Sequence, residues 1–116
     1  MDVGDKVEVK YQIQSGDLAK ALSADPQVDF PEVYATSRMV ALMELAAARL
    51  MTPLLSDGEL SVGVNINVNH VAATPNNVVV RAVATYLGME RKLYKFSVAL
   101  YDPAGEAGNG HIHVLL

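Results

Sequence analysis

The chain has 116 residues, of which 51% are hydrophobic and 19% charged, and its 9 basic and 13 acidic side chains give a formal net charge of −4. A chain of this length forms one domain, 1–116, that needs no metal or disulfide to fold, and the absence of cysteine excludes thiol nucleophiles and cysteine-ligated metal sites. The acidic balance, without a dense Lys/Arg stripe, argues against binding to nucleic acid.

The amino end carries no recognisable targeting signal, and no segment suits a membrane. Residues 1–10 alternate charged and apolar side chains instead of presenting a basic region followed by an apolar run. The longest apolar stretch, residues 39–55, is interrupted by Glu44, Arg49 and Pro53 and is shorter than the roughly 20 residues of a membrane span. We therefore expect a soluble protein, and the lack of cysteine fits the reducing cytoplasm.

The first predicted element is a strand. Residues 6–13 alternate apolar and polar side chains, which is the period-two pattern of a half-buried strand. Residues 14–30 then carry Gly16, Pro26 and several aspartates, with only a weak helical turn around residues 18–22. We interpret this segment as an irregular cover.

A helix is expected next. Thr36 or Ser37 can cap its free amide groups, and Pro53 marks its end. Residues 40–48 contain one charge among alanine, leucine, methionine and valine, so apolar groups cover most of the helix circumference. Such a helix is expected to be wrapped on several sides.

The remainder of the chain shows strand patterning in three long segments and one short one: residues 60–71, 77–87, 92–101 and 111–116. Residues 88–91 are expected to form a tight hairpin, and the glycine-rich residues 102–110 a second turn. One strand, one apolar helix and four strands in short antiparallel connection predict an α+β fold, in which an antiparallel sheet curls around one long central helix. This order resembles the hotdog fold.

Glu44 breaks the apolar pattern of the predicted helix. Its neighbours three and four residues away are a valine and alanines, none of which can pair with a carboxylate. A desolvated, unpaired carboxylate costs several kcal/mol, so Glu44 must meet a polar partner elsewhere, meet water or be protonated. It is either a residue on a wet edge or, as we favour, a site carboxylate.

His70 closes a strand pattern in which the valines, Ile66 and His70 share the apolar face, while Gly63 shares the other face with three asparagines. The histidine is either a hydrogen-bonded core residue or, if Glu44 lies opposite, a group that orients the carboxylate or exchanges protons with water. Gly63, in mid-strand, is either a bulge or a place where a ligand approaches the backbone.

Thr36 is either a helix cap or a site residue together with Glu44. Eight residues of helix separate the two by about 12 Å along the axis and about 80° around it, so they cannot touch within one straight helix. If both serve one substrate, either the chain bends before the helix or the two residues come from different protomers of a dimer.

A metal or nucleotide site is not expected. His111 and His113 share a face of the last predicted strand, but no carboxylate stands at ligand spacing beside them. The glycines of residues 105–110 lack the strand-to-helix setting of a nucleotide-binding loop.

Motifs at several separated points point to one family. They are residues 30–36 (FPEVYAT), residues 39–44 (MVALME), Gly63 and residues 70–75 (HVAATP). Together they closely resemble the fluoroacetyl-CoA thioesterase group of hotdog proteins, from Phe30 to about Asp102. Because type and spacing agree at several positions, the resemblance is more specific than a single histidine or glutamate.

This resemblance implies the roles of five residues. Thr36, Glu44 and His70 match the catalytic constellation of the family. Gly63 matches a glycine whose backbone approaches the thioester carbonyl, and Phe30 matches an aromatic gate over the acyl pocket. The implied activity is hydrolysis of a small acyl-CoA thioester to free acid and CoA, with Glu44 as nucleophile or general base supported by His70 and Thr36. The CoA thioester is the substrate, and no cofactor is implied.

The chain also departs from the family pattern. Near Gln27 a second gate aromatic of the fluoroacetate-specific enzyme is replaced, and the chain ends at Leu116, inside the last predicted strand. The reaction class is therefore carried over, and the particular acyl group is not.

CoA is polyanionic, so an acidic protein must gather positive charge locally, and four candidates are available: Arg38, Arg91, Lys92 and Lys95. A curved sheet with unpaired strand edges predicts a homodimer. Two other functions stay open, namely a hotdog acyl-CoA hydratase or dehydratase and a non-catalytic acyl-CoA-binding protein.

Overall fold

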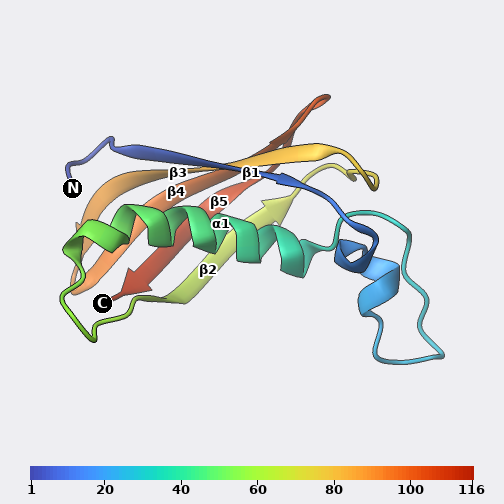
Figure 1. The fold of residues 1–116 in the computed structure, drawn as a ribbon, viewed down its shortest axis with the longest axis horizontal. Coiled ribbons are helices and arrows are strands. Elements are labelled where there is room, and N and C mark those ends of the chain that lie inside the picture. Colours follow the sequence, from blue (N-terminus) through green and yellow to red (C-terminus); the bar gives the residue numbers. More distant parts are fainter.

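The computed structural model describes all 116 residues and shows one antiparallel sheet wrapped around one long helix (Figure 1). The strands are β1 (Lys6–Gln12), β2 (Val62–His70), β3 (Val79–Glu90), β4 (Leu93–Asp102) and β5 (Gly105–Leu115). The helix is α1 (Thr36–Met51), and short 3-10 turns are η1 (Ser15–Asp17), η2 (Ala19–Leu22) and η3 (Thr52–Leu54). The predicted α+β architecture is confirmed, and no helix is long and apolar enough to span a bilayer.

The strand order is β1-β3-β4-β5-β2, which corrects the expectation of short connections throughout. β2 and β3 are not neighbours, because the chain crosses from one side of the sheet to the other between them. The β3–β4 hairpin turns at Arg91 and Lys92, with Glu90 opposite Leu93, and not at residues 88–91 as a whole.

The last strand is longer than predicted, because the glycines that indicate a turn belong to β5. The turn is only two residues, Pro103 and Ala104, and Asp102 already pairs with Gly105. A Cβ added at Gly108 would collide with the Met39 sulfur. Close approach of α1 therefore explains this glycine better than a turn does.

The core lies between one face of α1 and the concave face of the sheet. Seven helix residues are buried there: Met39, Leu42, Met43, Ala46, Ala47, Leu50 and Met51. Their spacing is that of an amphipathic helix, and the alanines allow the helix to approach the sheet closely. The predicted wrapping on several sides is wrong for the single chain, because Leu45 on the outer flank is 46% exposed.

β2 forms a free edge of the sheet, since it pairs only with β5. Leu60, just before it, and Val62, Val64 and Ile66 within it are all exposed. An exposed apolar edge strand is a template for pairing with another strand.

Residues 13–35 form the cover segment beyond the amino end of α1 (Figure 1). The predicted helical turn is confirmed as η2. The segment folds back on itself through a bridge between Leu18 and Tyr34 and through the Ala19 N–H, which donates to the Val33 carbonyl (2.8 Å). Tyr34 N–H donates to the Thr74 carbonyl (2.8 Å), so the segment is also tied to the crossover between β2 and β3.

Candidate active site

Thr36 is the first residue of α1, but its side chain does not cap the helix. The N-cap is Ala35, and the amino end has no side-chain cap hydrogen bond, which corrects the capping interpretation. The Thr36 hydroxyl lies 2.8 Å from Nδ1 of His70 instead. Thr36 therefore belongs to α1 through its backbone, while its hydroxyl is directed to β2.

His70 is the last residue of β2 and is partly buried. Burial lowers its pKa below the ordinary 6.5, so the ring is neutral near pH 7. Its Nδ1 contacts Thr36, whereas Nε2 is buried without any hydrogen-bond partner in the chain. A buried nitrogen without a partner can form a hydrogen bond with an incoming group.

A largely apolar cavity of about 380 Å³ lies at this pair. Ten residues line it: Ala19, Phe30, Pro31, Val33, Tyr34, Thr36, His70, Val71, Ala72 and Ala73. The structure therefore brings together three of the predicted site residues, Phe30, Thr36 and His70. Phe30 is 45% exposed, as a residue at the rim would be.

Five further lining residues of this cavity were not predicted from the sequence. Tyr34 and Val33 come from the cover segment, and Val71, Ala72 and Ala73 from the chain after β2. The one available signal was their position inside the two motifs that also contain Thr36 and His70.

Glu44 lies further along α1 and meets β2 at its other end. Its Oε2 accepts a hydrogen bond from the Gly63 N–H (3.0 Å), so the unpaired carboxylate of the sequence finds a polar partner in the strand backbone. A Cβ at Gly63 would lie 2.8 Å from that oxygen, so only glycine leaves the carboxylate in place. In this structure the amide is already bonded to Glu44 and orients it, and the approach of the Gly63 backbone to a thioester carbonyl stays a prediction.

A β-bulge explains why Gly63 faces the helix. The register shifts between Gly63 and Asn65, so Gly63 pairs with buried Val114 and Ile66 with buried Ile112. The predicted alternation, which placed Gly63 on the face opposite Ile66 and His70, is therefore wrong at this point. One of the two interpretations of the mid-strand glycine, a bulge, is confirmed.

The two pairs are far apart in one chain. Thr36 and Glu44 are separated by about 12 Å of helix, and Gly63 and His70 by about 23 Å of strand. Glu44 and Gly63 do not line the cavity at His70. A single chain thus holds two halves of the expected constellation at opposite ends of β2.

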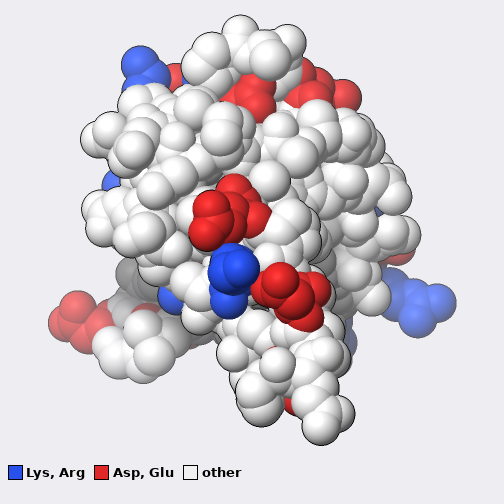
Figure 2. Space-filling view, turned by 90° about the vertical axis from the view of Figure 1, so that its right-hand side faces the viewer, with Lys and Arg blue, Asp and Glu red and all other residues white.

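Two of the four basic candidates for CoA have acidic neighbours. Arg38 Nε lies 3.7 Å from Asp17 and Lys95 Nζ 3.1 Å from Glu90, whereas Arg91 and Lys92 make no ion pair. The end of the molecule with the cover segment is mostly uncharged, and near its middle one basic side chain lies between two acidic ones (Figure 2).

The histidines on β5 contribute no catalytic contact. Nε2 of His113 lies 3.4 Å from the Glu90 carboxylate, which Lys95 also approaches, and His111 is exposed. Both lie on the sheet face away from α1, because the residue between them, Ile112, is buried in the core.

A family model described as fluoroacetyl-CoA-specific thioesterase (FlK) matches residues 13–115. The chain belongs to this family. The fluoroacetyl-CoA thioesterase of Streptantibioticus cattleyicolor is 43% identical over 82 residues, which are 71% of this chain and 59% of that relative. The match therefore spans less than two thirds of the relative's length.

Solved structures confirm the hotdog fold of this family. A mutant of the fluoroacetyl-CoA-specific thioesterase FlK in complex with fluoroacetate and CoA has a TM-score of 0.93 at 33% identity, over 99% of this chain and 94% of that one. A hot-dog-like protein from Thermanaerovibrio acidaminovorans, at 21% identity, has a TM-score of 0.82 over 97% of this chain and 81% of that one. The predicted family and fold are thus confirmed.

Proposed function

We propose that this protein hydrolyses a small acyl-CoA thioester to the free acid and CoA. The observation that carries this proposal is the contact of Thr36 with His70 at the wall of an apolar cavity, in a chain of the fluoroacetyl-CoA-specific thioesterase family. The unpartnered Nε2 gives the cavity a group that can exchange a proton with substrate or water.

The proposed catalytic unit is a homodimer formed through β2. Two β2 edges that pair antiparallel about the middle of the strand, with residue 70 opposite residue 63, place His70 and Thr36 of one copy beside Gly63 and Glu44 of the other. The exposed apolar edge supports this arrangement, because pairing satisfies its free backbone groups and covers Val62, Val64 and Ile66. Each dimer then contains two equivalent sites.

Glu44 has two chemical routes in such a site. As general base it takes a proton from water while the water oxygen forms the new C–O bond; the C–S bond then breaks, and the proton passes through His70 to the thiolate. As nucleophile, a Glu44 oxygen attacks the carbonyl carbon and expels the thiolate, and water then hydrolyses the mixed anhydride. In both routes Gly63 orients the carboxylate and Thr36 holds the imidazole ring.

The cavity favours a short acyl chain. Its wall is mainly alanine, valine and aromatic carbon, and Phe30 stands at the rim as the proposed gate. The relatives are named for fluoroacetyl-CoA, which makes this thioester the first substrate to test beside acetyl-CoA. Gln27, in the exposed part of the cover segment, offers no second aromatic at the gate.

Arg91 and Lys92 are proposed to hold the CoA phosphates. Their hairpin lies at the Gly63 end of β2, because Tyr94 pairs with Val114 and Val114 with Gly63. In the proposed dimer this end adjoins the cavity of the other copy. Neither side chain has an acidic partner, unlike Arg38 and Lys95.

The test is thiol release from a panel of short acyl-CoAs, including fluoroacetyl-CoA. Glu44→Gln keeps the size of the side chain and removes its basicity, so we expect kcat/KM to fall by about 10²- to 10⁴-fold. The control is Glu8→Gln, which alters an exposed carboxylate on β1, at the opposite edge of the sheet from β2. Undiminished hydrolysis by Glu44→Gln contradicts the proposal, and so does loss of enoyl-CoA absorbance without thiol release, which indicates a hydratase. Bound acyl-CoA that stays intact after long incubation indicates a binding protein instead.

A further inference from the structure

Asp17 is the only charged residue that is buried, with 8% of its surface exposed. It ends η1, where the cover segment begins. Burying a carboxylate costs free energy, and an apolar side chain could fill the same space without that cost. The contacts of the carboxylate therefore need a reason other than packing.

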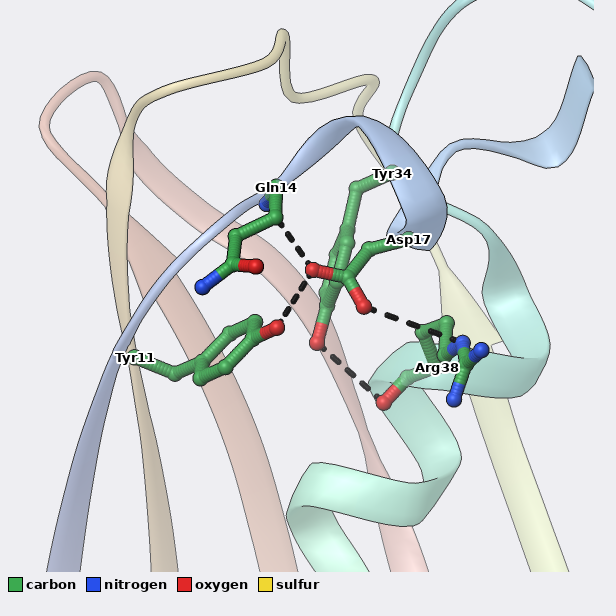
Figure 3. Close-up of polar contacts among 5 residues, drawn as sticks. All are labelled: Tyr11, Gln14, Asp17, Tyr34 and Arg38. Carbon is green, nitrogen blue, oxygen red and sulfur yellow. Dashed lines mark hydrogen bonds and ion pairs between the residues drawn. The ribbon is translucent and has the colours of Figure 1, made fainter. Parts of the chain in front are cut away.

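These contacts join three parts of the chain (Figure 3). Oδ2 accepts hydrogen bonds from the Tyr11 hydroxyl of β1 (2.5 Å) and from the Gln14 N–H (2.8 Å), and Oδ1 lies 3.7 Å from Arg38 Nε on α1. The backbone carbonyl of Asp17 accepts the Ala35 N–H (3.0 Å). Asp17 thus fastens the cover segment to β1 and to the entry of α1.

Tyr34 connects this cluster to the cavity. Its hydroxyl donates to the Arg38 carbonyl (3.1 Å), and its ring lines both the cavity at His70 and a second cavity of about 240 Å³, which Asp17 and Arg38 also line. Tyr34 therefore separates the two cavities. Asp17 and its partners lie on the other side of Tyr34 from the cavity at His70, and Asp17 contacts Ala35, which precedes Thr36.

We infer that Asp17 is a positioning residue of the proposed reaction: its carboxylate ties Arg38 of α1 to β1, its backbone carbonyl holds Ala35, and together these contacts keep the Thr36 hydroxyl on His70. The inference rests on the proposed thioester hydrolysis. Asp17 itself does not line the cavity at His70, so it acts through the residues it holds.

The experiment compares Asp17→Asn with wild type in thiol release and in hydrogen–deuterium exchange. The amide of asparagine keeps the size but removes the negative charge that faces Arg38, and it replaces one of the two acceptor oxygens with an NH2 group that only donates. We expect kcat to fall by about 10-fold with KM changed by less than about 3-fold, because misplacing a catalytic pair affects the chemical step. Amides of residues 33–37 should exchange faster, while those of β3 and β4 stay protected.

Two further variants separate positioning from loss of stability. Ile112→Val, in the core and away from the cavity, lowers the melting temperature without touching the cluster, and it should keep the wild-type kcat. Tyr11→Phe keeps the carboxylate and removes one donor, so it should show a smaller change in the same direction; it decides the question if Asp17→Asn does not fold.

Every outcome of these experiments either supports or overturns the inference. An unchanged kcat with active wild type, or faster exchange throughout the sheet, overturns the inference and leaves the proposed function intact. A wild type that hydrolyses no acyl-CoA overturns the proposed function, and with it the assigned role of Asp17.

Discussion

The two ends of β2 hold different halves of the proposed site. At the carboxyl end, His70 lies in a cavity with a threonine hydroxyl as its one hydrogen-bond partner. At the amino end, Glu44 is held by a backbone amide beside an exposed edge. One end supplies an apolar cavity and a neutral imidazole, and the other supplies a carboxylate held by a backbone amide. In the proposed dimer, a complete site combines the opposite ends of two copies.

Subunit complementation tests this comparison most severely. Glu44→Gln and His70→Asn should each lower kcat/KM by about 10²-fold or more. After the two inactive variants are mixed and allowed to exchange, thiol release should return to about a quarter of the wild-type value, because about half of the dimers are mixed and each mixed dimer has one intact site of two. Sites built within single chains give no recovery in this mixture.

A charge at the middle of β2 should prevent two copies from pairing through this strand. Ile66 is 40% exposed and lies close to the proposed dimer axis, so Ile66→Lys places two like charges next to each other. We expect sedimentation as a monomer and thiol release lowered by about 10-fold or more, in proportion to the dimer lost. Leu87→Lys changes an equally exposed residue of β3 and should remain dimeric and active. An active monomer of Ile66→Lys argues against the shared site.

Gly63→Ala disturbs the carboxylate end alone. The new Cβ would lie 2.8 Å from Glu44 Oε2, and the flexible glutamate can swing away, so the fold should keep its melting temperature while kcat/KM falls by about 10-fold. Gly16→Ala, where no atom lies within 4 Å of an added Cβ, is the matched control. Equal activity of the two variants means that the orientation of Glu44 by Gly63 is unimportant.

The imidazole end has the smallest predicted effect, a dependence on pH. Because burial lowers the pKa of His70 below 6.5, the unfolded chain binds this proton first as the pH falls. The folded state should lose stability as the pH falls below 6.5 and show no contribution from His70 above it. The ring resonances in NMR should titrate with a midpoint below 6.5, and His70→Asn should remove this part of the pH dependence of unfolding. A midpoint above 6.5 contradicts the assignment.

The sequence predicted more of the fold than of the contacts. Period-two patterns and the apolar helix located β1, α1 and the α+β architecture, because these signals are local. The place of β2 at the edge and the crossover to β3 depend on pairing between distant segments, which no local pattern records. The glycines of β5 indicated a turn, yet Gly108 makes room for Met39.

The candidate site divides in the same way. Glu44 was recognisable because it had no partner on its own helix, and the partner proved to be the amide of Gly63. The bulge that turns Gly63 toward α1 reverses the predicted face and could not be read from alternation. Asp17 carried no sequence signal, because its partners come from β1 and α1 and meet only in the fold.

The length of β2 affects the proposed sites as well as the stability of the sheet. Each residue advances a strand by about 3.3 Å, and side chains alternate between faces, so in the proposed dimer the length of β2 sets the distance between the two catalytic sites. Removing two residues from its middle would keep each group on its face of the sheet but shorten the distance between Gly63 and His70 by about 7 Å. The bulge between Gly63 and Asn65 adds one residue to β2 and so determines that Gly63 faces α1.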